Sequence, residues 1–156
     1  MNQRTGAQMG AYASSARRSQ MQPEIVQDWR EGVPVVAVSG DHDVTTAAKV
    51  RATIREANGG RKNVVLSLEK LAFMDSSIMG VLFISHRALV ERGARLIVHC
   101  PDTTPVCQLL RVARLDDVVD VVQTLEEAID LARRPLNVPA SDQAVAERVD
   151  LQPDVE

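Results

Sequence analysis

The middle of the chain alternates between short runs of β-branched residues and longer stretches in which apolar residues recur every three or four positions. The short runs are typical of strands, and the longer spacing is typical of amphipathic helices. Glu31-Gly32 separates the first two runs and predicts a hairpin-like start. We expect strands at Glu24–Arg30, Val33–Ser39, Lys62–Leu68, Arg95–His99 and Asp117–Val122, and helices from Asp43 or Thr45 to Asn58-Gly59-Gly60, at Ser77–Arg92, at Thr103–Val112 and at Thr124–Arg133.

This order of elements predicts the fold class. Strands that are joined through helices run parallel, whereas the opening hairpin adds one antiparallel strand. The apolar residues Leu71, Phe73 and Met74 are expected to continue the β structure of Lys62–Leu68 toward an exposed end of the sheet. We therefore expect an α/β fold with a mixed, mostly parallel β-sheet and flanking helices.

The two ends of the chain differ from its middle. Residues 1–23 are rich in Gly, Ala, Ser and Gln and contain no acidic residue, so they have little apolar surface to bury. Prolines and mixed charge mark the other end, although its AVAERVDL segment could form a weak helix. The sequence predicts a flexible N-terminal tail at 1–23, one domain at 24–133 and a C-terminal tail at 134–156.

Composition narrows the classes of function. The 156 residues, of which 45% are hydrophobic, suffice for one core, and the net charge of −3 offers no basic field for nucleic acid or anionic lipid. One Trp, one Tyr and two Phe provide few platforms for base stacking. No apolar run approaches the roughly 18 residues of a membrane span, and no secretory signal is present. We expect a cytoplasmic protein that binds neither nucleic acid nor membrane.

The segment Asp75-Ser76-Ser77 stands between a predicted strand and a predicted helix. All three residues are good N-cap types, and the first turn of a helix carries free N–H donors and the positive end of the macrodipole. A phosphate on Ser76 would add about −1.5 to −2 charge beside the Asp75 carboxylate and could switch the docking of a partner. The alternative is that these serines only cap the helix.

The sequence LEKLAFMDSSIMGVLF, which contains this segment, resembles the signature of the anti-sigma factor antagonist family (STAS domains), in which a strand ends in Phe-Met/Leu-Asp-Ser-Ser/Thr-Gly-Leu-Gly-Val. Upstream, VAVSGDHDVTTA resembles the strand-Gly-Glu-Leu-Asp-x-x-Thr-Ala turn of that family. The second match would place Gly40, Asp43, Thr46 and Ala47 on a loop beside the serines. The resemblance covers about residues 24–132 and implies a single STAS-like domain.

The resemblance also implies a function. Members of the family bind an anti-sigma factor and so free a sigma factor, and the first serine after the aspartate accepts phosphate from an anti-sigma factor that is a serine kinase. In this chain the matching residue is Ser76, so the resemblance implies that Ser76 is the phosphorylated serine. The residues that would bind the partner are Asp43, Thr46, Asp75, Ser76, Ser77, Met79 and Phe83. The chain departs from the motif at Ile78 and Met79, where the family has Gly and Leu, and a β-branched residue there is expected to narrow the space around the hydroxyl.

The helix that follows the serines is apolar on nearly every side, more than one core-facing stripe can hide. Either it is buried on two sides within the domain, or part of it faces a partner near Met79 and Phe83.

Other chemistry finds less support in the sequence. Cys100 and Cys107 are expected to be small buried residues, with a redox-controlled regulator as the alternative, and His99 adds no convincing fourth ligand for a metal site. Ser76, His42 and Asp43 contain the residue types of a catalytic triad, but no G-x-S-x-G elbow or phosphate-binding glycine loop is present. We expect no enzyme, no cofactor and no metal; a stress-sensing scaffold component remains the second binding alternative.

Overall fold

A mixed sheet of six strands forms the centre of the structure, a computed structural model that describes residues 21–135. Five strands follow the order β1-β2-β3-β5-β6, and β4 pairs with the far end of β2. Only β1 is antiparallel to its neighbour, so the predicted hairpin and the predicted fold class are confirmed. The strands are β1 Glu24–Arg30, β2 Val33–His42, β3 Val64–Ser67, β4 Leu71–Met74, β5 Leu96–His99 and β6 Asp120–Val122.

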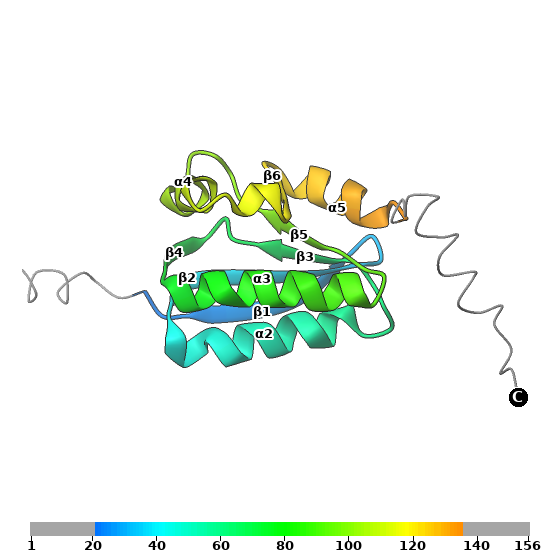
Figure 1. Cartoon of the computed structure of the whole chain (residues 1–156), viewed down its shortest axis with the longest axis horizontal. Helices are drawn as coiled ribbons and strands as arrows, with labels where there is room; N and C mark the ends of the chain where they lie inside the picture. Colours follow the sequence, from blue (N-terminus) through cyan, green and yellow to red (C-terminus); the bar gives the residue numbers. More distant parts are fainter. Residues whose placement is uncertain (1–20, 136–156) are drawn as a thin grey trace, which may run out of the picture.

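Helices cover both faces of this sheet (Figure 1). The helices α2 and α3 lie side by side on one face, and α5 packs against β2, β3, β5 and β6 on the other. The short α4 and the 3-10 helix η1 follow β5. Their bounds are α2 Val44–Asn58, α3 Ser76–Glu91, α4 Pro105–Val112, η1 Leu115–Asp117 and α5 Leu125–Arg133.

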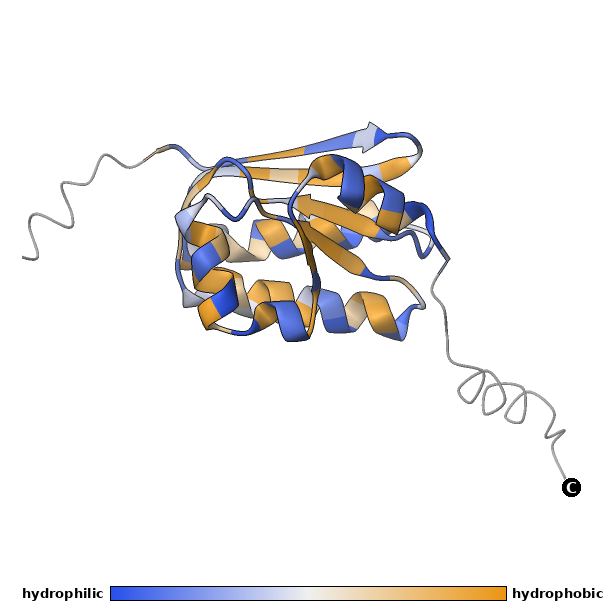
Figure 2. Ribbon diagram, turned by 90° about the horizontal axis from the view of Figure 1, so that it is seen from above, coloured by the Kyte–Doolittle hydropathy of each residue, from blue (hydrophilic) through white to orange (hydrophobic). Residues whose placement is uncertain are grey.

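Alternation along the strands explains the two layers of core. In β3, Val64 and Leu66 belong to the main core under α2 and α3, whereas Val65 belongs to a smaller core with Ala128 and Ile129 of α5. Successive side chains of a strand point to opposite faces, so a strand buried on both sides must be apolar throughout. The central strands are coloured as hydrophobic in Figure 2 for this reason.

Gly40 lies at the point where β2 stops pairing with β3 and begins to pair with β4. The strand pairs with β3 at Val35–Ala37 and with β4 at Gly40–His42, and the register shifts between Gly40 and Asp41. Gly40 has φ +81°, and a Cβ there would lie 2.1 Å from the carbonyl oxygen of Gln22. Only glycine fits both the backbone conformation and the space.

Three expectations need correction. The β structure after Lys62–Leu68 is not a continuation of one strand, because a turn with a hydrogen bond from the Leu71 amide to the Leu68 carbonyl (3.1 Å) separates β3 from β4. The strand expected at Asp117–Val122 begins only at Asp120, because Asp117 belongs to η1 and the amides of Val118 and Val119 donate to the Leu115 carbonyl oxygen. The helix expected from Thr103 begins at Pro105, with Thr104 as its N-cap. Most of the predicted tails, 1–23 and 134–156, lies outside the described residues.

Candidate functional site

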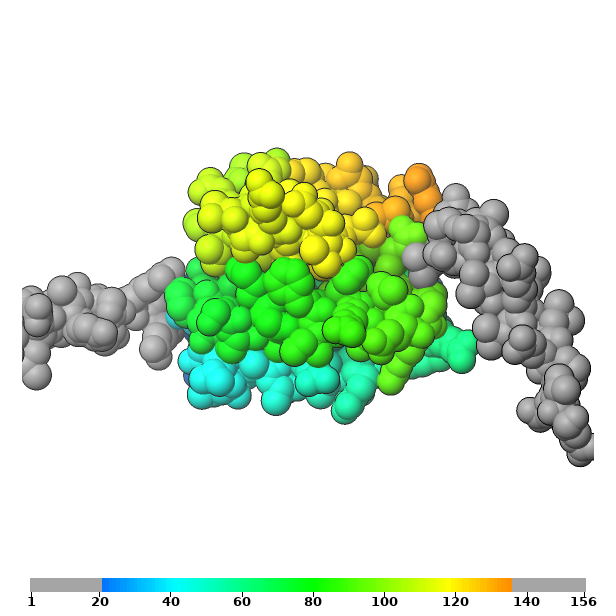
Figure 3. All heavy atoms as spheres, in the orientation of Figure 1, coloured from blue at the N-terminus to red at the C-terminus, as the bar shows by residue number. Residues whose placement is uncertain are grey.

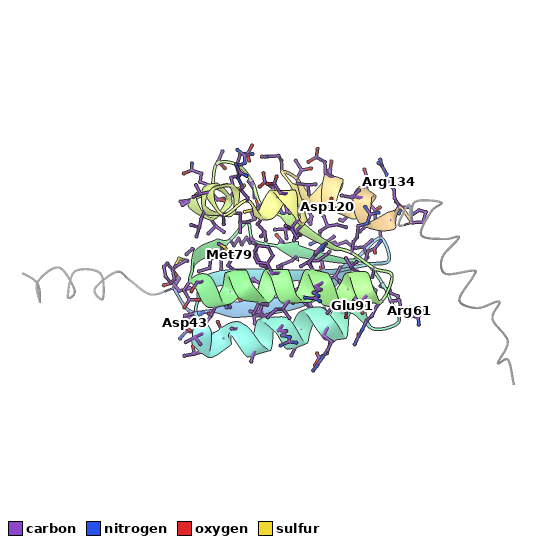
Figure 4. All side chains as sticks on the ribbon, in the orientation of Figure 1. Asp43, Arg61, Met79, Glu91, Asp120 and Arg134 are labelled. Atoms are coloured by element: carbon purple, nitrogen blue, oxygen red, sulfur yellow. The ribbon has the colours of Figure 1, made fainter. Side chains whose placement is uncertain are left out.

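The starts of α2 and α3 meet at one edge of the sheet. His42, the last residue of β2, pairs in register with Met74, the last residue of β4. The next residue of each strand, Asp43 and Asp75, leaves the sheet there and caps the helix that follows. In Figure 4, Asp43 and Met79 are labelled at this common end of the two helices. The pairing of β2 with β4 thus places the two motif segments next to each other.

Ser76 is the first residue of α3, and its side chain is exposed. The Asp75 carboxylate accepts hydrogen bonds from the amides of Ser77 (2.9 Å) and Ile78 (3.4 Å) and from the Ser77 hydroxyl. Within residues 21–135 no group is hydrogen-bonded to the Ser76 hydroxyl. The structure therefore holds this hydroxyl at the surface, free to react, with a carboxylate on the neighbouring residue.

Asp43 and Thr46 form a capping box at the start of α2. The Asp43 carboxylate accepts from the hydroxyl and the amide (2.8 Å) of Thr45, and these hydrogen bonds lower the pKa of Asp43. The Asp43 amide donates to the Thr46 hydroxyl oxygen at 3.3 Å. Asp43 is exposed and ionised at neutral pH, so the edge carries a carboxylate from each of the two helix starts.

A buried histidine fixes the geometry of this loop. Nε2 of His42 lies 2.9 Å from the Ser39 carbonyl oxygen, which can only accept, so Nε2 carries the proton. Nδ1 lies 2.9 Å from the Thr46 hydroxyl. His42 is fully buried. Sequence reasoning considered this residue only for a catalytic triad, whereas the structure makes it a link between the end of β2 and the first turn of α2.

The edge also holds a polar hollow of about 420 Å³. Asp41, Thr46 and the exposed ring of Phe73 contribute to its lining. Asp41 and Phe73 are register neighbours across β2 and β4, so the hollow depends on a strand pairing that the sequence did not reveal. An acidic rim with an aromatic ring suits contact with a protein partner better than with an anion.

The expectation about Ile78 is wrong. Its side chain is only 1% exposed and belongs to the main core, so it points away from the Ser76 hydroxyl rather than crowding it. Met79 is partly buried against the same core. The departure from the family motif therefore enlarges the core under the first turn of α3 and leaves the access to Ser76 open.

The outer side of α3 carries an exposed apolar stripe. Phe83 is 37% exposed, and Val90 and Val118 are each half exposed. Together with His86 they line a shallow hollow of about 580 Å³ between α3 and the segment after η1. Figure 3 shows α3 in green between α2 in cyan and this segment in yellow. The two interpretations of α3, burial within the domain and exposure to a partner, therefore each hold for one side of the helix. Its inner side packs in the core, and its outer side is exposed to solvent.

The two cysteines are buried and free. The Cys107 thiol donates to the Cys100 carbonyl oxygen at 3.2 Å. Desolvation by burial raises the pKa of both thiols, that of Cys107 to about 12. Since the thiolate is the form that reacts with oxidants, these properties count against the redox alternative.

Two further properties bear on metal and membrane binding. Within residues 21–135, no three His, Cys, Asp or Glu side chains are arranged to hold a metal ion. In the same part of the chain, no helix is long and apolar enough to cross a membrane.

Comparison with known proteins identifies the class to which this fold and site belong. A family model for the STAS domain matches residues 24–128. The anti-sigma F factor antagonist of Paenibacillus polymyxa is 33% identical over 103 residues, which cover 65% of this chain and 87% of that protein. The chain therefore belongs to the anti-sigma factor antagonist family of STAS domains.

Solved structures show the same fold. An anti-sigma factor antagonist from Mycobacterium paratuberculosis has a TM-score of 0.61 at 23% identity, covering 72% of this chain and 96% of its own. The antagonist SpoIIAA in its unphosphorylated form gives 0.54 at 26% identity, covering 72% and 98%. The phosphorylated form of the Bacillus cell fate determinant SpoIIAA gives 0.52 at 27% identity, covering 72% and 100%. Anti-sigma factor antagonists are regulators rather than enzymes, and their partner is an anti-sigma factor.

Proposed function

We propose that this protein binds an anti-sigma factor, so that a sigma factor is freed, and that phosphorylation of Ser76 switches this binding off. The observation that carries the proposal is the exposed, unbonded Ser76 hydroxyl at the start of α3, next to the capping carboxylate of Asp75. The likeness to an anti-sigma F factor antagonist, and to a related protein that exists in a phosphorylated form, supports it.

The chemistry of the edge explains how such a switch would act. Asp75 already occupies the amides of Ser77 and Ile78, so a phosphoryl group on Ser76 would find few free donors in the first turn. It would instead add a dense negative charge to an edge that carries Asp43 and Asp75. A partner surface that is complementary to the neutral hydroxyl would then face uncompensated charge on docking.

We assign the partner surface to both helix starts and to the outer side of α3. It comprises Asp43, Thr46, Asp75, Ser76, Ser77, Met79 and Phe83. The polar residues would set specificity and orientation, while Phe83 supplies exposed apolar area of the kind that anchors interfaces. We further propose that the anti-sigma factor is itself the serine kinase. When it is bound to this surface it would lie next to the Ser76 hydroxyl and could transfer phosphate to it.

The test begins with capture of the partner from the native cytoplasm by the full chain and its identification by mass spectrometry. Calorimetry with the purified partner then compares wild type with Ser76→Ala and Ser76→Glu. We expect Ser76→Ala to bind within about twofold of wild type and Ser76→Glu to bind at least about tenfold more weakly, equivalent to ~1.4 kcal/mol.

Gln108→Glu is the matched control, because it adds the same single charge at an exposed position of α4. It should leave the affinity unchanged. Equal affinities of wild type, Ser76→Ala and Ser76→Glu would refute the switch, and capture of a partner that is not an anti-sigma factor would refute the proposed function.

A further inference from the structure

A second site lies in the groove between α2 and α3, away from the edge that holds Ser76. Its volume is about 170 Å³, well above the ~15 Å³ that one water needs. Arg51, Arg55 and Arg92 line it together with Ser85, above a floor that includes Ile54 and Leu89. Ser85 stands nine residues after Ser76, which is about 13 Å along the helix.

The three arginines have no carboxylate partner in the part of the chain that the structure describes. The ion pairs found there join other arginines to Asp or Glu. Arg51 and Arg55 are spaced i, i+4 on one helix, where two like charges repel each other. Arg92 is held in place by a hydrogen bond of 3.3 Å from its guanidinium to the buried Asn58 side chain. Three arginines without an ion-pair partner among the described residues thus line one groove.

The fourth polar group of the groove points to a ligand independently. Ser85 is 4% exposed, and its hydroxyl has no hydrogen-bond partner in the structure. A serine inside a helix usually donates to the carbonyl four residues earlier or faces water, and a buried hydroxyl without a partner destabilises the folded state. This buried hydroxyl is therefore an unused donor on a residue that lines the groove, and the three arginines beside it are donors as well.

We propose that this groove binds a phosphate-class oxyanion, either free phosphate or the phosphate of a small monoester. Guanidinium groups bind phosphate oxygens through paired N–H donors, and a hydroxyl supplies a further donor to a tetrahedral anion. All four polar groups of the groove can donate, so an anion with several acceptor oxygens satisfies them better than a ligand that mainly donates. The small, partly apolar groove fits one such group rather than a nucleic-acid backbone, which needs an extended basic surface.

The test is calorimetry of the full chain with sodium phosphate, at constant ionic strength maintained with sodium chloride. We expect saturable binding of one phosphate per chain. Arg51→Gln and Arg55→Gln should each weaken it by about tenfold or more, because a hydrogen bond to a charged group is lost. Lys49→Gln is the control: it removes the same charge from the same helix outside the groove and should change the affinity by less than twofold.

Two further variants distinguish binding in this groove from binding at the edge that holds Ser76. Ser85→Ala should weaken phosphate binding while raising the melting temperature of the free protein, because it removes a buried hydroxyl that lacks a partner. Ser76→Ala should bind phosphate like wild type, so this result is independent of the proposed switch. Calorimetry with O-phosphoserine distinguishes a phosphate monoester from free phosphate as the ligand. If O-phosphoserine binds as tightly as inorganic phosphate, the groove recognises any phosphate group. If only inorganic phosphate binds, the ligand is the free ion.

The proposal is overturned if phosphate shows no saturable binding. It is also overturned if Arg51→Gln and Arg55→Gln bind phosphate like Lys49→Gln, or if Ser76→Ala abolishes the binding.

Discussion

A negative charge at position 76 should be energetically coupled to Asp75, and this coupling can be measured without the partner. The perturbation is Ser76→Glu, introduced into wild type and into the Asp75→Asn background. Asparagine keeps a side-chain oxygen that can accept from the Ser77 amide, so the cap survives while its charge is lost. The pair of backgrounds therefore isolates the repulsion between two carboxylates from the loss of a cap.

The size of the effect follows from the geometry. For carboxylates of neighbouring residues about 6 Å apart, Coulomb's law gives about 0.7 kcal/mol in water and about 2.8 kcal/mol at an effective dielectric constant of ~20. A glutamate in the first turn also gains about 0.3–1 kcal/mol from the helix dipole in both backgrounds. Because Asp75 is only partly buried, we expect a coupling free energy of about 1 kcal/mol, with Ser76→Glu less favourable in wild type than in Asp75→Asn.

Urea denaturation of the four proteins measures this coupling directly, since the dipole contribution cancels in the double-mutant cycle. Repetition in 1 M NaCl, where the Debye length is about 3 Å, should remove most of it. A coupling below about 0.5 kcal/mol in low salt, or one that persists in high salt, would refute the argument that Asp75 makes Ser76 sensitive to charge.

Three other predictions concern separate parts of the molecule. Gly40→Ala should lower the free energy of unfolding by more than ~1 kcal/mol in urea titrations, because its Cβ would meet the Gln22 carbonyl; a loss below half of that would contradict the argument. Phe83→Ser should weaken binding of the anti-sigma factor by about tenfold in calorimetry, and because the residue is only 37% exposed it should also lower the free energy of unfolding by about 1–2 kcal/mol. The raised pKa of Cys107, about 12 against an ordinary 9.0, means that the unfolded state loses this proton first as pH rises. Stability should therefore fall between pH 9 and about 12, by up to ~1.4 kcal/mol per unit, and less so in Cys107→Ala.

The sequence predicted those parts of the fold whose signals are local. Glu31-Gly32 sets the hairpin, and Asp43 and Asp75 cap their helices as the N-cap preference requires. The sequence also placed Ser76 at the junction of a strand and a helix, because Asp75, Ser76 and Ser77 are all favourable N-cap types. These features need only the residues within one turn.

The features that sequence reasoning missed depend on contacts between distant segments. Leu71–Met74 has the apolar pattern of a strand, but its pairing with β2 instead of β3 depends on Gly40, some 30 positions earlier, where β2 changes partner. The 3-10 turn η1 interrupts a run that resembles one strand because the amides of Val118 and Val119 donate to the Leu115 carbonyl oxygen (3.0 and 2.8 Å). An apolar pattern does not reveal whether such amides bond within a turn or to a neighbouring strand.

The candidate site also combines residues that the sequence predicted with contacts that it did not. Its motif residues were predicted, but the link through His42 to Thr46 and the inward direction of Ile78 were not. The arginines of the α2–α3 groove are ordinary in sequence, since i, i+4 charges normally mark a solvated face. They become informative only when Arg92 and the buried Ser85 are seen on the opposite side of the same groove.

The short junction between β4 and α3 has a consequence for insertions and deletions. One residue, Asp75, separates Met74 from the helix, and the angular phase of α3 is therefore set by the sheet. An α-helix turns about 100° per residue, so one inserted residue would swing the buried face, which includes Ile78, Leu82 and Leu89, toward solvent. The same rotation would carry Ser76 away from the surface. Selection for a packed core alone thus keeps the length of this junction constant, and with it the accessibility of Ser76.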